Sequence, residues 1–288
     1  MNDKHSLVFA YSDIYFFVFK QKMLSLYAIC MSFHVVTFPY DAGANMKGSC
    51  DSPDCISRKF NFESSRIIIT DDVEADLQNL YEKNLNILNS GEIPLNVGGD
   101  HSLAIGSVAA TQEYCHTNQL TLGVLWLDAH LDYNTFETSP SKNLHGMSVA
   151  VLCGHTLNHL YHGTKNLSSD QFCYFGVRDV DDLELKRFES STCKLAKTIE
   201  ECQEWLNKFD VLHVSLDIDV LDPIFAPGVN TPVNQGKSLI EVLQCIDCIP
   251  QSKINSVDIV EYNPSQDIEN ITLTSVCKII ERLRHKIE

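Results

Sequence analysis

Short apolar runs alternate with amphipathic stretches along the chain from Phe33 onward. The apolar runs predict strands at Phe33–Phe38, Ile93–Val97, Leu122–Leu127, Phe172–Phe175, Val211–Leu216 and Ser256–Val260. The amphipathic stretches predict helices at Asp72–Asn89, Ser102–His116, Lys237–Cys248 and Ile268–Arg284. Strands that alternate with helices are typical of βαβ units. We therefore predict an α/β fold: a single three-layer domain with a mainly parallel central sheet flanked by helices.

Residues 1–32 do not follow this alternation and form an atypical N-terminal extension. Its apolar run, Ile14–Phe19, is short and is bounded by charged residues, so we do not expect a transmembrane helix. The extension is either an extra element packed on the domain or a segment absent from the working protein, which would then begin at Met31; we favour the second. The predicted catalytic domain is residues 33–288.

Charge and composition narrow the class of protein. The chain has 288 residues and 44% hydrophobic residues, enough for one large α/β domain with a sizeable core. Its formal net charge of −16 argues against binding to nucleic acid or to an anionic membrane surface, both of which favour a basic protein. We therefore expect neither nucleic acid nor a membrane surface as a partner.

The eleven cysteines show no disulfide spacing and their number is odd, which favours a reducing compartment and hence the cytoplasm. Cys245 and Cys248 form a Cys-x-x-Cys motif. We do not expect a redox or zinc role for it, because it lies in a predicted amphipathic helix and has no second pair spaced for zinc.

Acidic and imidazole side chains follow four predicted strands, at the point where each strand ends. They are His101 after Ile93–Val97; Asp128, His130 and Asp132 after Leu122–Leu127; Asp217 and Asp219 after Val211–Leu216; and Glu261 after Ser256–Val260. Ligands of open α/β sheets bind beyond the carboxyl ends of the strands. Side chains two apart in a strand share a face, so we expect Asp128, His130 and Asp132 to project together.

Each of these residues has an ordinary structural reading. A lone His101 is more often a helix-start or core histidine, Asp217 alone is more often a cap, and Asp100 is better read as a support residue than as a ligand. Together, however, so many unpaired carboxylates would be costly to bury. The set of candidate metal ligands is His101, Asp128, His130, Asp132, Asp217 and Asp219.

Six ligands are too many for one structural zinc ion, and they suit two divalent ions about 3.5–4 Å apart that share carboxylates. Oxygen-rich ligation favours manganese or magnesium over zinc, and the two imidazoles favour manganese. From the residues alone we predict a binuclear metallohydrolase.

Three motifs carry a resemblance to a known family. Gly98-Gly-Asp-His-Ser102, Asp128-Ala-His-Leu-Asp132 and Ser215-Leu-Asp-Ile-Asp219, the last followed by Asp222-Pro223, resemble the signatures of the ureohydrolase family in order and spacing. That family includes arginases and agmatinases, and the resemblance runs from Phe33 to the C-terminus. It implies an arginase-like fold, two Mn²⁺ ions per subunit and a homo-oligomer, a trimer or hexamer.

The resemblance also implies roles for individual residues. His101 and Asp132 would bind one manganese ion and His130 and Asp219 the other, with Asp128 and Asp217 bridging. A bridging hydroxide would attack the guanidinium carbon, and Asp132 would pass its proton to the leaving amine. Glu261 would pair with the guanidinium group, and His145 would act as proton shuttle or general acid.

Within the family the chain most resembles the arginases. The segment after the second motif places Asn134 and Ser141 where arginases read the substrate's α-carboxylate, and Asp181, supported by Glu184, where they read its α-amino group. This set implies hydrolysis of L-arginine to L-ornithine and urea, as in arginine metabolism and the urea cycle. Agmatine has no carboxylate to read.

Three alternatives remain at this point. The first is an agmatinase or another ureohydrolase acting on a guanidino or formimino substrate. The second is a deacetylase-like enzyme with a single zinc ion, against which His101, Asp217 and Asp219 argue. The third is a catalytically inactive regulatory homologue, which would have no need for six buried ligands.

The chain departs from the family's pattern outside the ligand positions. The segment Asp41–Asp54, which is rich in Gly, Asn, Ser and Pro and predicts a surface loop, is a loose match. Asn230-Thr-Pro232 and Gln235-Gly236 replace glycine-rich forms often seen there. Because the six candidate ligands lie outside these segments, the departures bear on how the substrate fits or how subunits contact one another more than on metal binding.

Overall fold

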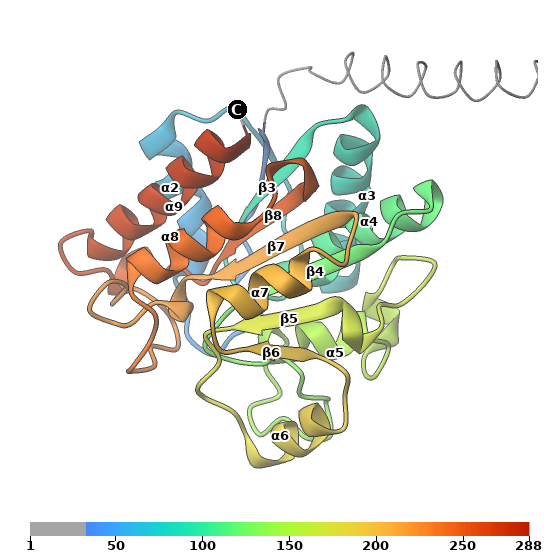
Figure 1. The fold of residues 1–288 in the computed structure, drawn as a ribbon. Helices are drawn as coiled ribbons and strands as arrows, with labels where there is room; N and C mark the ends of the chain where they lie inside the picture. Colours follow the sequence, from blue (N-terminus) through green and yellow to red (C-terminus); the bar gives the residue numbers. More distant parts are fainter. Residues whose placement is uncertain (1–32, 288) are drawn as a thin grey trace, which may run out of the picture.

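The computed structural model describes residues 33–287 and contains one sheet of eight parallel strands (Figure 1). The strand order is β2-β1-β3-β8-β7-β4-β5-β6. The strands are β1 (Phe33–Phe38), β2 (Ser64–Arg66), β3 (Ile93–Gly98), β4 (Leu122–Leu127), β5 (Phe172–Phe175), β6 (Lys194–Ala196), β7 (Val211–Asp217) and β8 (Ile254–Val260). The predicted α/β fold is confirmed.

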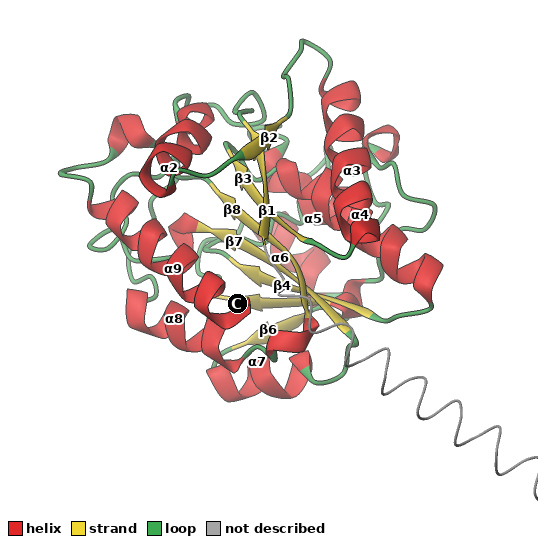
Figure 2. Cartoon of the chain, turned by 90° about the horizontal axis from the view of Figure 1, so that it is seen from above, coloured by secondary structure: helices red, strands yellow, loops and turns green. Residues whose placement is uncertain are grey.

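Helices cover both faces of the sheet, so the domain has three layers (Figure 2). The α-helices are α2 (Ser52–Phe60), α3 (Val73–Ser90), α4 (Leu103–Asn118), α5 (Ser148–Leu152), α6 (Asp182–Glu189), α7 (Ile199–Leu206), α8 (Leu239–Cys248) and α9 (Ile271–Ile287). Helices α2, α7, α8 and α9 lie on one face and α3, α4 and α5 on the other. None of the helices in residues 33–287 is long and apolar enough to cross a membrane.

The alternation of side chains along β4 explains why this strand is central. Leu125 and Leu127 join the core beneath α7, α8 and α9, while Val124 and Trp126 join the core beneath α4 and α5. Every residue of β4 is buried. A strand covered by helices on both faces must be apolar on both faces, which is why it reads as an unbroken apolar run.

The six predicted strands and four predicted helices are all present, with ends shifted by a few residues at most. The elements that the pattern does not predict are short. Strands β2 and β6 have three residues each, and α5, α6 and α7 have five to eight. Elements of this length carry too few apolar positions to show a period.

The expectation of a surface loop over Asp41–Asp54 is wrong for its second half. A 3-10 turn spans Ser49–Asp51 and α2 begins at Ser52, with Pro53 in its first turn. Proline is favoured at that position because it has no N–H to lose and its φ suits the helix. Ser49, Ser52 and Pro53 are buried, so the segment is part of the domain rather than a surface turn. The predictions made for residues 1–32 lie outside the described residues.

The ten cysteines among the described residues are all free thiols. The Cys-x-x-Cys motif has spatial neighbours that its sequence does not reveal. Cys202 of α7 contacts both Cys173 of β5 and Cys245 of α8, and Cys245 contacts Cys248. The four thiols come from β5, α7 and α8 and lie together in the core beneath α7 and α8, where cysteine packs as a small hydrophobic residue.

Candidate metal and substrate site

The predicted site residues come from four strands that are neighbours in the sheet. β3, β8, β7 and β4 lie side by side in that order and run parallel, so their carboxyl ends meet at one edge. His101 follows β3, Glu261 follows β8, Asp217 ends β7, and Asp128 follows β4. The crossovers bring together side chains that are up to 160 residues apart along the chain.

His101 lies at the centre of a first group of carboxylates. Its Nδ1 is 3.0 Å from Asp128 Oδ2, 3.1 Å from Asp132 Oδ2 and 3.2 Å from Asp217 Oδ2. Both His101 and Asp128 are fully buried. Nδ1 has no hydrogen-bond partner in spite of its burial. A buried nitrogen that faces three carboxylate oxygens at 3.0–3.2 Å is placed as a metal ligand would be among other ligands.

His130 forms a second group that shares one carboxylate with the first. Its Nδ1 is 3.3 Å from Asp128 Oδ1 and 3.1 Å from Asp219 Oδ2. Within each group, His101 with Asp128 and Asp132, and Asp128 with His130 and Asp219, all ligand atoms lie within 4.8 Å of one another. The two oxygens of Asp128 thus face different groups, so two ions could share this side chain.

The electrostatics of the site require positive charge. Burial, with the charges of Asp219 and Asp128, raises the pKa of Asp217 well above its ordinary value. Burial alone would lower the pKa of His101, but its contacts with Asp128, Asp132 and Asp217 outweigh burial and raise that pKa well above its ordinary value. The carboxylates therefore attract either protons or cations, and the oxygen-rich, imidazole-containing donor set fits divalent metal ions.

The local backbone differs from the expected strand. β4 ends at Leu127, so Asp128, His130 and Asp132 do not share one strand face. Asp132 has a φ of 50°, in the left-handed region. The chain bends over residues 128–130, and this bend, with the left-handed conformation of Asp132, replaces the two-residue period of a strand and leaves Asp132 Oδ2 3.1 Å from His101 Nδ1.

A buried network of side chains holds His101 from behind. His101 Nε2 is 2.9 Å from Ser215 Oγ, which donates a hydrogen bond of 3.2 Å to Asp258 Oδ2. The imidazole stacks on the indole of Trp126, with ring centroids 4.1 Å apart, and Trp126 Nε1 donates to Asp128 Oδ2 at 2.9 Å. Contacts of this kind fix the tautomer and orientation of a metal-binding histidine.

Asp258 of β8 is the hub of this network. Its Oδ2 is 2.7 Å from His213 Nε2 and accepts from Ser107 Oγ at 2.8 Å, and its Oδ1 accepts from Asn96 Nδ2 at 2.9 Å. All of these side chains are fully buried. Although burial favours the neutral acid, His213 and the hydroxyl and amide donors hold the pKa of Asp258 below its ordinary value.

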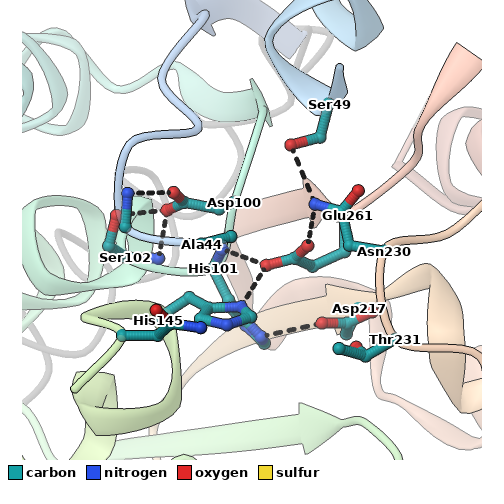
Figure 3. A network of polar contacts seen from close by, with 12 residues as sticks. Ala44, Ser49, Asp100, His101, Ser102, His145, Asp217, Asn230, Thr231 and Glu261 are labelled. Atoms are coloured by element: carbon teal, nitrogen blue, oxygen red, sulfur yellow. Dashed lines mark hydrogen bonds and ion pairs between the residues drawn. The ribbon is translucent and has the colours of Figure 1, made fainter. Parts of the chain in front are cut away.

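Glu261 has three donors from the protein itself (Figure 3). Its Oε1 accepts from the backbone N–H of His101 and lies 2.8 Å from His145 Nδ1, and its Oε2 accepts from Asn230 Nδ2 at 3.1 Å. Although burial favours the neutral acid, the charge of His145 keeps the pKa of Glu261 below its ordinary value. Burial opposes the charge of His145, but Glu261 raises its pKa to about 9, so His145 is mainly cationic near neutral pH.

A pocket with a volume of about 130 Å³ opens over the carboxylate groups. Four of the predicted substrate-binding residues, Asn134, Ser141, Asp181 and Glu184, line it, as does His145. Asn134 Nδ2 donates to Asp181 Oδ2 at 3.0 Å. Buried Glu184 accepts from the backbone N–H of Tyr133 at 2.8 Å. Glu261 does not line the pocket; it lies behind His145.

Sequence reasoning missed several residues of the site. Trp126 lies within the apolar run Leu122–Leu127, and its place two residues before Asp128 is the signal that would have pointed to it. Thr231 lines the pocket and donates to Asp219 Oδ2 at 3.0 Å. Asp258 carries no signal in the sequence, because its partners lie far away along the chain, and Asn230 stands out there only as a departure from a glycine-rich form. Asp100 supports the loop between β3 and α4, because its carboxylate accepts hydrogen bonds from the backbone N–H groups of Gly43 and Ser102.

Comparisons with known proteins agree with this geometry. A sequence profile of the arginase family matches residues 32–285. The chain is 34% identical over 268 residues to an arginase of Bacillus subtilis, covering 88% of each protein, and 35% identical over 224 residues to an arginase of Entamoeba histolytica, covering 73% and 74%. The crystal structure of Bacillus subtilis arginase superposes with a TM-score of 0.80 at 33% identity, covering 88% of this chain and 98% of that one.

Proposed function

The chain belongs to the arginase family, and on this premise we propose that it is a binuclear manganese hydrolase that converts L-arginine and water to L-ornithine and urea. The observation that carries the proposal is the pair of donor groups that share Asp128 beneath a pocket lined by Asn134, Ser141 and Asp181. A metal cluster alone would suit many hydrolases. The amide, hydroxyl and carboxylate that line the pocket are suited to an α-amino acid.

In this proposal His101 and Asp132 would hold one Mn²⁺ ion and His130 and Asp219 would hold the other, and Asp128 and Asp217 would be shared. Support comes from the two oxygens of Asp128, which face the two imidazoles separately. Two such ions would lower the pKa of a water molecule between them and so supply a hydroxide nucleophile near neutral pH.

The protein's own side chains then bind and orient the substrate. Asn134 and Ser141 donate to the α-carboxylate, and Asp181, supported by Glu184, accepts from the α-amino group. Glu261 pairs with the guanidinium group, since a carboxylate matches that planar fork. The guanidinium reaches Glu261 only when the 2.8 Å contact between His145 and Glu261 opens.

Two groups move protons in the proposed reaction. Asp132 accepts the remaining proton of the attacking hydroxide and passes it to the leaving amine. His145 donates a proton to the leaving amine or exchanges one with solvent through the pocket that it lines. Cleavage of the carbon–nitrogen bond then leaves ornithine as the amine and urea as the neutral amide.

Metal analysis tests the two-ion part of the proposal. Protein expressed with manganese and then dialysed should contain two Mn²⁺ ions per chain. Fewer than about one ion per chain would contradict it.

The substrate part has a separate test. Asp181→Ala should lower kcat/KM for L-arginine by about tenfold or more, because it removes a charged hydrogen-bond acceptor, and should leave metal content unchanged. Unchanged arginine turnover in this variant would favour another guanidino or formimino substrate.

Assembly and location belong to the same proposal. We propose a homo-oligomer in the cytoplasm, with arginine metabolism as its setting. Ile224, Ile240 and Ile271 are exposed around an apolar groove, which suits a contact between copies of the chain. The free cysteines suit a reducing compartment. Sedimentation equilibrium should give a trimer or hexamer; a monomer at micromolar concentration would contradict the assembly.

A further inference from the structure

Asn230 occupies a position that the proposed reaction does not yet use. It lies in the loop after β7, is 5% exposed, and its amide is directed at the carboxylate of Glu261 (Figure 3). Asn230 belongs to the segment Asn230-Thr-Pro232, which replaces a glycine-rich form often seen in the family that the sequence resembles. A side chain placed here is therefore an addition to the pattern, and its contacts indicate what it adds.

The orientation of the Asn230 amide is fixed by its neighbours. Its Oδ1 accepts from Asn263 Nδ2 at 2.7 Å, and Asn263 Nδ2 also donates to the carbonyl of Lys47. Asn263 Oδ1 in turn accepts from Ser265. With its oxygen occupied in this way, the amide must present its NH₂ group to Glu261 and to Ser49 Oγ, which is 3.3 Å away.

The lone pairs of Glu261 indicate what the hydrogen bond from Asn230 does. Each carboxylate oxygen has two acceptor positions. Oε1 is filled by His101 N–H and His145, while Oε2 holds only Asn230. When His145 withdraws, each oxygen keeps one protein donor and offers one free lone pair. One free lone pair on each oxygen can accept one of the two parallel N–H groups of a guanidinium ion.

We propose that Asn230 is a positioning residue for guanidinium recognition: with the His101 backbone N–H it forms a two-point clamp that holds the Glu261 carboxylate plane after His145 leaves. The clamp acts on the guanidinium end of the substrate and not on its amino-acid end. Without Asn230, Oε2 has no donor and the carboxylate can rotate about its terminal bond. This inference rests on the proposed arginase function and on Glu261 as the guanidinium partner.

Asn230→Leu tests the clamp, because leucine has a similar branched shape and no donor. kcat/KM for L-arginine should fall about tenfold to a hundredfold, the range for a lost hydrogen bond to a charged group. L-Ornithine has the same amino-acid end but no guanidinium, so its inhibition constant should change less than about twofold. Manganese content should not change.

Ser49→Ala is the matched control, since it removes the other partner of Asn230 Nδ2 and leaves the Glu261 contact in place. It should keep kcat/KM within about twofold of the wild type. An Asn230→Leu enzyme with unchanged kcat/KM would overturn the inference. So would a parallel loss of ornithine binding, which would mean a general structural role. Failure of the wild type to release urea from arginine would instead refute the proposed function itself.

Discussion

Replacing Asp258 by asparagine should destabilise the fold and weaken the metal site together. Asp258 is fully buried and accepts hydrogen bonds from Asn96, Ser107 and Ser215 while pairing with His213 at 2.7 Å. Asparagine keeps the shape but presents an NH₂ group to side chains that are themselves donors. Each buried donor left without its acceptor costs about 1–3 kcal/mol, so with several donors around Asp258 we expect a loss of about 3–5 kcal/mol in the free energy of unfolding at pH 7.

The pH dependence of this loss follows from the lowered pKa of Asp258. A carboxyl group whose pKa is lower in the folded than in the unfolded state stabilises the fold above its unfolded pKa, here about 3.8. That stabilisation disappears as the pH falls through the folded pKa. The difference between the wild type and Asp258→Asn should therefore be full at pH 7 and should shrink below about pH 4.

Urea denaturation with a chelator present measures the fold alone, and a manganese titration measures the metal site. Ser215→Ala separates the two effects, because it removes only the link between His101 and Asp258. It should lose about 1 kcal/mol of stability but about tenfold to a hundredfold in manganese affinity. A loss below about 1 kcal/mol in Asp258→Asn, or manganese affinity within twofold of wild type in Ser215→Ala, would refute this reasoning.

Other predictions follow from the same geometry. Burial raises the pKa of Glu184 from 4.5 to about 7, so ionisation of Glu184 increasingly opposes folding as the pH rises from 4.5 to 7. In urea denaturation of the metal-free protein, Glu184→Gln should therefore be more stable than the wild type by up to about 3 kcal/mol at pH 8, and equally stable at pH 4. An equal difference at both pH values would exclude this cause. His145→Asn should lower kcat at least tenfold without loss of manganese, and metal loss would mean that His145 is misassigned. His130→Asn should reduce bound manganese from two ions to one per chain by metal analysis, whereas retention of two would remove His130 from the ligand set.

The central part of the fold could be predicted from sequence because both faces of the sheet are covered. Strands such as Leu122–Leu127 and Phe172–Phe175 must then be apolar throughout, and the ends of these two runs match the ends of β4 and β5. The strand order could not be predicted in the same way. The pairing of β3 with β8 joins residues such as Leu95 and Val257, which no local pattern connects.

The candidate ligands were predictable for a related reason. Each follows an apolar strand directly, and parallel strands end at one edge, so proximity in space follows from position in sequence. The residues that hold the ligands were not predictable. Asp258 is an ordinary polar residue in the sequence, and Asn230 is only a departure from a glycine-rich form. The packing of β8 against β7 gives Asp258 its partners, and the packing of the loop after β7 against Glu261 gives Asn230 its partner.

The segment Asp41–Asp54 illustrates a third kind of limit. Its Gly, Asn, Ser and Pro residues are typical of turns, and part of it is a turn. Its burial depends on contacts with distant residues, including the bond from Gly43 N–H to Asp100 and the bond from Asn263 to Lys47. Turn chemistry indicates local shape, but it does not indicate which other segment covers the turn.

The most direct test of the account is a urea-release assay with L-arginine and agmatine as alternative substrates, with and without manganese. Agmatine carries the same guanidinium group but lacks the carboxylate that Asn134 and Ser141 are proposed to read. The account predicts manganese-dependent urea release from arginine and at least about a hundredfold lower kcat/KM for agmatine. Equal or faster release from agmatine, or release that does not depend on added metal after chelation, would contradict it.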